Sequence, residues 1–97
     1  MNHRVAILGV GLIGGSLALA FKERTNCSVV GFDTSAETIN QALSMDVVDE
    51  GYTSLELAAV DADYIFIAVP VGQIGNYINQ LVEIPLKKGV LDYYPFI

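Results

Sequence analysis

The chain has 97 residues, of which 53% are hydrophobic and 16% charged, so it makes one domain at most and suits a sheet covered by helices on both faces. Its formal net charge of −6 argues against partners such as nucleic acid or an anionic membrane surface. No apolar run is typical of a membrane span, and the single cysteine allows no internal disulfide, which favours a cytoplasmic location.

A glycine-rich turn follows the first predicted strand. Val5–Leu8 form a short apolar run of the kind found in buried parallel strands. Gly9, Gly11 and Gly14 follow in the spacing G-x-G-x-x-G. In a dinucleotide-binding domain the first glycine permits a tight turn, the second lets a pyrophosphate approach the backbone, and the third lets helix and strand pack closely. The sequence therefore predicts a phosphate loop here.

The next predicted element is a helix from Leu12 to about Arg24. Its free N–H groups and positive dipole end can receive phosphates without a lysine or arginine. Ser16 is placed either to reach a phosphate oxygen or to permit close helix packing, and both interpretations stay open. The apolar positions expected to face the sheet for the most part are Leu12, Leu17, Leu19, Ala20 and Phe21.

The second predicted strand, Ser28–Phe32, ends in Asp33, at the distance from the glycines where the fingerprint requires an acidic residue. Its carboxylate can accept hydrogen bonds from the ribose hydroxyls of an adenosine, and its alternative is a turn or helix-capping role. Thr34 follows, and Ser35 is expected to cap a helix that runs to about Met45. Because no cation follows Asp33 to compensate a 2′-phosphate, NAD is favoured over NADP.

A secretory signal is the main competing interpretation of the first twenty residues. Met1–Arg4 would be the charged region, Val5–Leu17 the apolar core and Ala18–Ala20 the cleavage site. This interpretation leaves Asp33 and the following strand pattern unexplained, and we reject it.

The middle of the chain is less regular. Val47–Val48 is predicted as a short edge strand, and Tyr52–Leu57 as a connection into a helical turn that ends at Ala59. Asp61 and Asp63 flank the next strand and are interpreted as element-end charges rather than as a metal or acid–base pair.

Tyr64–Val69 is the clearest predicted strand after the first, and it stops at Pro70. In a doubly wound sheet the ends of the first and fourth strands meet at the switch point, so Val69, Pro70 and Val71 are expected in the cofactor cleft. A helix is predicted over Gly72–Val82, with a later start if Gly75 disfavours the first turns. Its apolar face is expected to contain Ile74, Ile78, Leu81 and Val82, and Gly89–Asp92 is predicted as a fifth strand.

Four blocks of this chain together resemble the start of the prephenate dehydrogenase family: Gly9–Ala18, Gly31–Asp33, Asp61–Asp63 and Ala68–Val71. The resemblance implies an NAD-dependent oxidative decarboxylation of prephenate or arogenate in tyrosine biosynthesis. It also implies that the backbone N–H groups of Leu12 and Ile13 face the pyrophosphate. The fold expected is α/β, a doubly wound, mostly parallel Rossmann sheet in three α/β/α layers. The predicted cofactor site is Gly9, Gly11, Leu12, Ile13, Gly14, Asp33, Thr34, Val69, Pro70 and Val71.

The chain departs from the family after its predicted fifth strand. The family continues with a D-x-x-S-x-K segment and a histidine-bearing H-P motif, whereas here Asp92 is followed by the aromatic tail 93–97. The family's catalytic histidine, substrate-binding arginine and helical dimerisation domain have no counterpart, and the single histidine, His3, precedes the first strand. We expect residues 1–92 to be a truncated dinucleotide-binding domain without catalytic or metal-binding residues, which binds a small-molecule substrate only with the missing domain.

Two other functions fit the same residues. One is a non-catalytic NAD-binding or interaction module, which could self-associate through the apolar segment 93–97. The other is the cofactor domain of a dehydrogenase for another small acid.

Overall fold

The elements of the chain alternate between strands and helices, and the structure, a computed structural model, describes residues 3–86. In order they are β1 (Arg4–Leu8), α1 (Leu12–Arg24), β2 (Ser28–Phe32), α2 (Ala36–Ser44), β3 (Glu50–Tyr52), α3 (Leu55–Ala59), β4 (Tyr64–Ile67) and α4 (Val71–Leu81). The predicted strand Gly89–Asp92 and the tail 93–97 lie outside the described residues.

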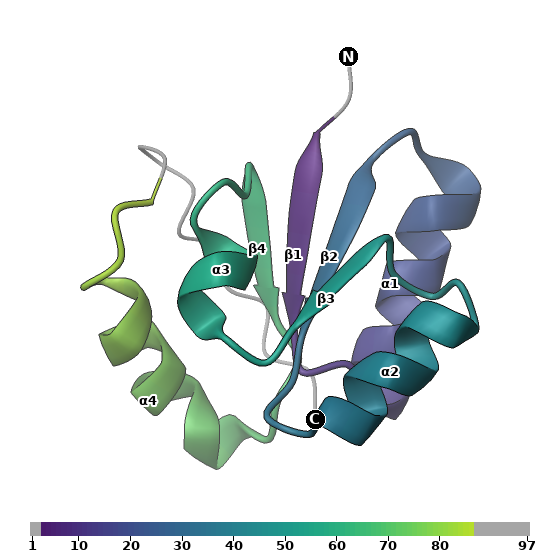
Figure 1. Cartoon of the computed structure of the whole chain (residues 1–97). Helices are drawn as coiled ribbons and strands as arrows, with labels where there is room; N and C mark the ends of the chain where they lie inside the picture. The colour runs from purple at the N-terminus through teal and green to yellow at the C-terminus, as the bar shows by residue number, and fades with distance from the viewer. Residues whose placement is uncertain (1–2, 87–97) are drawn as a thin grey trace.

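All four strands are parallel and form one sheet in the order β3-β2-β1-β4. Val5 of β1 lies between Val29 of β2 and Tyr64 of β4, so the first strand of the chain is central. Helices α1 and α2 cover one face of the sheet, and α3 and α4 cover the other (Figure 1). This is the predicted doubly wound, three-layer α/β/α arrangement, and the switch of direction falls between β1 and β4.

The alternation of side chains along the central strands gives each helical layer its own core. Ala6 and Leu8 point to the layer of α3 and α4, where they pack with Ile65 and Ile67. Val5 and Ile7 point the other way, to the layer of α1 and α2. Because both faces are covered, β1 is apolar at every position after Arg4, as its sequence predicted.

The bounds predicted for α1 are those observed, but one apolar position of this helix was assigned to the wrong side. Leu19 is 40% exposed, whereas Ala18, next to it in the chain, is fully buried against the sheet. Gly14 and Ala18, four residues apart, both face inward, so small side chains line the contact of this helix with the sheet. The prediction that Leu19 faces the sheet was wrong because the close approach favours the smallest side chains.

The third strand lies later than predicted, at Glu50–Tyr52 instead of Val47–Val48. Val47 follows the end of α2 and donates its N–H back to the carbonyl of Ala42 in the last turn of that helix. Val48 is 2% exposed and packs in the core beside that helix. The β-branched pair therefore reflects burial of a connecting loop rather than pairing in a strand.

The fourth strand and fourth helix also differ from the prediction at their bounds. β4 ends at Ile67, although Ala68 still donates its N–H to Leu8. α4 begins at Val71, with Pro70 at its N-cap, so Gly75 does not delay the helix. Val82 was expected on the apolar face and is 63% exposed, because the helix ends before it.

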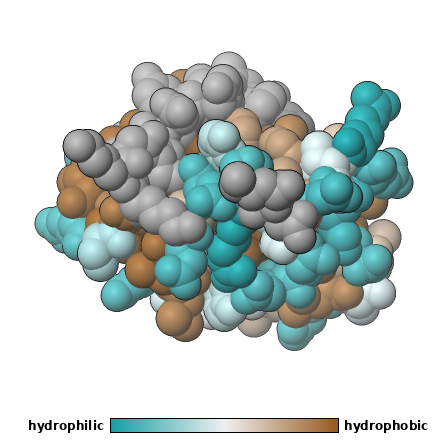
Figure 2. Space-filling model, turned by 90° about the horizontal axis from the view of Figure 1, so that it is seen from above, coloured by the Kyte–Doolittle hydropathy of each residue, from teal (hydrophilic) through white to brown (hydrophobic). Residues whose placement is uncertain are grey.

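Seen from the end at which the strands begin, the described surface mixes hydrophilic and hydrophobic side chains (Figure 2). Within residues 3–86, no helix is long and apolar enough to cross a membrane.

Candidate dinucleotide site

The turn after β1 needs its first glycine. Gly9 has φ +95°, a conformation that L side chains rarely adopt, and its N–H donates to the carbonyl of Phe32 over 2.7 Å. A Cβ at this position would lie 2.6 Å from the carbonyl oxygen of Ala68 and 2.8 Å from Cγ1 of Val69. Any larger residue would therefore push the segment that follows β4 away from the turn.

The third glycine of the motif permits a close approach. A Cβ at Gly14 would lie 1.8 Å from the carbonyl oxygen of Gly9 and 3.3 Å from Cβ of Ala68. Gly11, in contrast, is exposed, and a Cβ there would meet no protein atom within 4 Å. The protein itself thus requires glycine at two of the three positions and leaves open space at the second.

The open position marks the start of α1. Gly11 is the N-cap with φ −77°, no side chain caps the helix, and its first turn contains no acidic residue. The first helical hydrogen bond runs from the N–H of Gly15 to the carbonyl of Gly11 over 2.7 Å. Backbone N–H groups before it, with the positive dipole end, give the kind of helix start that can receive an anion.

Asp33 lies beside this turn, at the end of β2. Its Oδ2 accepts from the N–H of Val10 at 3.1 Å, and its Oδ1 accepts from the N–H of Ser35 at 3.0 Å. Ser35 caps α2 by accepting from the N–H of Thr38, as predicted. The turn role left open for Asp33 is therefore observed, and each carboxylate oxygen still has a second lone pair for a ribose hydroxyl.

The β4–α4 turn meets the glycine turn at the switch point. Val69 is 7% exposed and contacts the region of Gly9, whereas Val71 is 62% exposed at the start of α4. Pro70 is exposed between them, and Thr34 is exposed beside Asp33. The fold thus brings the predicted site residues to the carboxyl ends of β1, β2 and β4.

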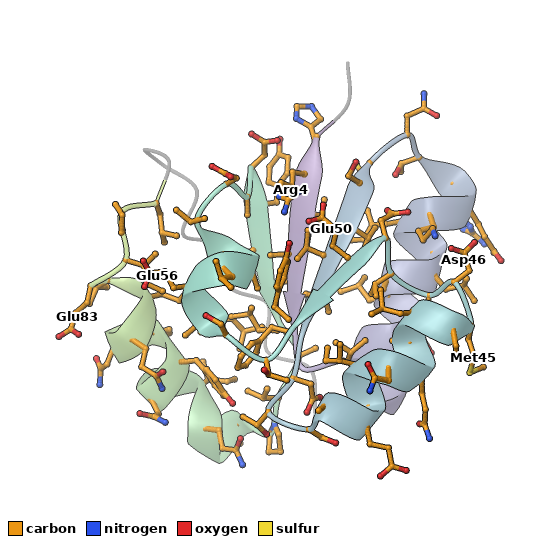
Figure 3. The ribbon with its side chains drawn as sticks, in the orientation of Figure 1. Arg4, Met45, Asp46, Glu50, Glu56 and Glu83 are labelled. Atoms are coloured by element: carbon orange, nitrogen blue, oxygen red, sulfur yellow. The ribbon has the colours of Figure 1, made fainter. Side chains whose placement is uncertain are left out.

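A groove of about 270 Å³ that sequence reasoning missed runs from the glycine turn between α1 and α2. Ser16 is exposed in this groove, which does not fit the packing role that was its alternative. Exposed Met45, labelled in Figure 3, forms its far end. The lining residues are Val10, Gly11, Gly15, Ser16, Leu19, Thr38, Gln41, Ala42, Met45 and Val47.

A group of charged side chains lies where the strands begin, at the opposite end of the sheet from this site. Arg4 donates from both terminal nitrogens to Glu50, at 2.6 and 3.1 Å, and the two are labelled near the upper end of the sheet in Figure 3. Hydrogen bonds from Arg4 and then from Tyr52 hold the pKa of Glu50 below its usual value. His3 stands at the same end, with Nδ1 3.9 Å from Oδ2 of Asp63.

The hydrogen bonds and ion pairs of Arg4, Glu50 and Asp63 join neighbouring segments of the sheet and do not form a reaction centre. Oδ2 of Asp63 accepts from the N–H of Arg4 at 2.7 Å, which is the element-end role predicted for this carboxylate. Among the described residues no group of His, Cys, Asp and Glu side chains could hold a metal ion. Ligands of open parallel sheets bind at the opposite end, beyond the carboxyl ends of the strands.

Comparison with known proteins identifies the family. Residues 17–92 match the family model described as prephenate dehydrogenase, nucleotide-binding domain. The chain belongs to this family. The matched range starts after the glycine turn, but the relatives below align over more than nine-tenths of the chain.

The relatives are much longer than this chain. Prephenate dehydrogenase of Bacillus subtilis (strain 168) is 36% identical over 92 residues, which are 94% of this chain and 25% of the relative. The structure of prephenate dehydrogenase from A. aeolicus in complex with hydroxyphenyl propionate and NAD+ is 27% identical, with a TM-score of 0.84 over 96% of this chain and 32% of that one. The arogenate dehydrogenase structure from Synechocystis is 26% identical, with a TM-score of 0.84 over 95% of this chain and 32% of that one. The chain thus spans about a quarter of the length of the curated relative.

Proposed function

We propose that this chain is the NAD-binding part of a cytoplasmic, NAD-dependent prephenate or arogenate dehydrogenase. The observation that carries the proposal is the uncapped start of α1 at Gly11, where a Cβ would meet open space. The carboxylate of Asp33 lies beside it and accepts a hydrogen bond from the N–H of the preceding residue, Val10. The similarity to a structure that contains NAD+ supports the choice of cofactor. When bound, NAD would accept a hydride from the substrate as carbon dioxide leaves.

The described residues fit a dinucleotide. The backbone N–H groups of Leu12 and Ile13 would hold the pyrophosphate beside Gly9, Gly11 and Gly14. Asp33 and Thr34 would contact the adenosine ribose. The nicotinamide side of the cleft would be lined by Val69, Pro70 and Val71, of which Val69 is buried against the glycine turn.

The charge around the ribose site supports NAD over NADP. No lysine or arginine occurs between Arg24 and Lys87, so residues 25–86 contain no cation for a 2′-phosphate. Lys22, on α1, is held 2.7 Å from Oδ1 of Asp46 and 3.1 Å from Oδ1 of Asp49. A 2′-phosphate would therefore meet the carboxylate of Asp33 without compensation.

We also propose that the chain does not turn over substrate by itself. Its single histidine, His3, stands where β1 begins, at the end of the sheet opposite the glycine turn. Hydride transfer needs a closed site that positions the substrate against the cofactor. We propose that substrate binding requires a part of the protein that corresponds to the remaining three quarters of the relatives' length. Formation of NADH from prephenate by the pure chain would contradict this.

Calorimetric titration with NAD+, with NADP+ as the competing ligand, tests the cofactor proposal. Gly11→Ala is the sharpest variant, because its Cβ meets no protein atom and occupies the space proposed for the pyrophosphate. We expect a folded protein that binds NAD+ at least about tenfold more weakly, a loss of about 1.4 kcal/mol. Gly75→Ala on α4 is the matched control, since its Cβ also meets nothing within 4 Å. Equal affinity of both variants, or preference for NADP+, would overturn the proposal.

A further inference from the structure

Two residues at the end of β2 contact the same residue of the glycine turn. Gly31 and Asp33 lie two positions apart, so they face the same side of the sheet. A Cβ at Gly31 would lie 3.0 Å from Cγ2 of Val10 and 3.0 Å from Cγ1 of Val48. The carboxylate of Asp33 accepts from the N–H of Val10 at 3.1 Å. One residue makes room for the Val10 side chain, and the other holds its backbone.

We propose that Gly31 and Asp33 together hold Val10 in place and so set the conformation of the phosphate loop. Asp33 is then a positioning residue for the pyrophosphate site, in addition to the ribose contact assigned to it above. This inference deepens the proposed function and rests on it for the identity of the ligand. On this inference, the end of β2 affects the affinity for the phosphates of the dinucleotide as well as for its adenosine ribose.

The position of Val10 explains why one contact has this effect. Val10 stands between Gly9 and Gly11, whose backbones are the least restricted of any residue type. Before it, the loop is fixed by the hydrogen bond from Gly9 to Phe32, and after it α1 begins. Val10 is 6% exposed, so its side chain is seated in the core while its N–H is held from the side. Loss of the contacts that hold Val10 would therefore let the backbone of Gly9–Gly11 move, and the N–H groups at the start of α1 would no longer be held in one orientation.

The first test needs no nucleotide. Amide hydrogen exchange at Val10 is compared between wild type, Asp33→Ala and the matched control Asp49→Ala. Asp49 also accepts a backbone N–H with its carboxylate, that of Val29 at 2.8 Å, but at the other end of β2. We expect exchange at Val10 to rise about tenfold or more in D33A and to stay at the wild-type rate in D49A. An unchanged rate in D33A would overturn the inference.

The second test separates positioning from ribose binding. The ligand is an NAD+ analogue that lacks both hydroxyls of the adenosine ribose, so no direct contact with Asp33 remains. We expect D33A to weaken this analogue about tenfold relative to wild type. If Asp33 serves the ribose alone, wild type and D33A bind the analogue equally, and the inference is refuted. Failure of every protein to bind NAD+ would refute the proposed function and leave the exchange test intact.

A rescue experiment covers the case in which D33A does not fold. Gly31→Ala pushes a Cβ against Val10 and Val48, both buried, and should weaken the analogue. Val10→Ala in the G31A background removes Cγ2 of Val10, which the new Cβ at position 31 would contact, and should restore most of the affinity for the analogue. Val48→Ala in the same background relieves only the other contact and should not. Rescue by V48A but not by V10A would show that the loop does not respond through Val10.

Discussion

Gly14→Ala should destabilise the protein severely, because the added methyl has nowhere to go. Its Cβ would lie 1.8 Å from the carbonyl oxygen of Gly9, a backbone atom of a residue already held at φ +95°. Overpacking a core typically costs about 1–3 kcal/mol, and obstruction by backbone puts this case at about 3 kcal/mol. A small domain has about 5–15 kcal/mol of stability in total, so the variant should lose a large part of it.

Gly15→Ala is the matched control in the same helical turn. Its Cβ would lie 3.9 Å from the carbonyl oxygen of Val10 and 3.9 Å from Cγ1 of Val47, which are ordinary contacts. Alanine is favoured over glycine in a helix by up to about 1 kcal/mol, so G15A should be neutral or stabilising. Urea unfolding followed by circular dichroism measures both variants. A G14A protein within about 0.5 kcal/mol of G15A would refute the close-approach reasoning.

Three further predictions concern the ion pairs and the cofactor. Glu50→Gln should cost less than about 1 kcal/mol at pH 7, since Glu50 is 40% exposed. Because the folded pKa of Glu50 is lowered, its contribution is present above its usual value of 4.5 and is lost as pH falls through the folded pKa, so wild type and E50Q should converge in acid urea titrations. Lys22→Met should cost about 0.5–1 kcal/mol, less in high salt, and a difference that does not respond to salt would contradict the role of Asp46 and Asp49. The hydrogen bond to Asp46, and then that to Asp49, raise the pKa of Lys22, so this contribution is complete below its usual value of 10.5 and is lost as pH rises through the folded pKa, which alkaline unfolding would measure. Asp33→Ser should narrow the preference for NAD+ over NADP+ in competition titrations, whereas Asp61→Ser, at the other end of the sheet, should not.

The sequence was sufficient to predict the elements whose ends carry local signals. The bounds of α1 and β2 were correct, because a glycine turn precedes the helix and Asp33 closes the strand. The cap of α2 at Ser35 is also a local signal, read from one residue and the N–H three positions later. Such features depend on neighbours in the chain and require no knowledge of the fold.

The errors arose where burial in three dimensions overrides the local pattern. Val47–Val48 has the composition of a strand but lies in a loop whose Val48 is buried, while β3 forms at Glu50–Tyr52, a segment with a glycine in its centre. The glycine is required because a Cβ at Gly51 would lie 2.7 Å from Cγ2 of Ile39 on α2. Nothing in the sequence around residue 51 states how close that helix comes.

The glycine motif contains two kinds of constraint that a sequence pattern cannot separate. Gly9 and Gly14 are required by protein atoms that a Cβ would strike, so they would be glycine even in a domain that never met a nucleotide. Gly11 meets no protein atom, so its requirement comes from a ligand or from nothing. The motif alone is therefore weaker evidence for cofactor binding than its three glycines suggest. Three features together distinguish a binding loop: an open second glycine position, an uncapped helix start, and an acidic residue that holds the residue between the first two glycines. Here these are Gly11, the start of α1, and Asp33 with its hydrogen bond from Val10. If G11A binds NAD+ as wild type does, the turn is only a packing device, and the assignment of cofactor binding to this loop fails while the fold remains.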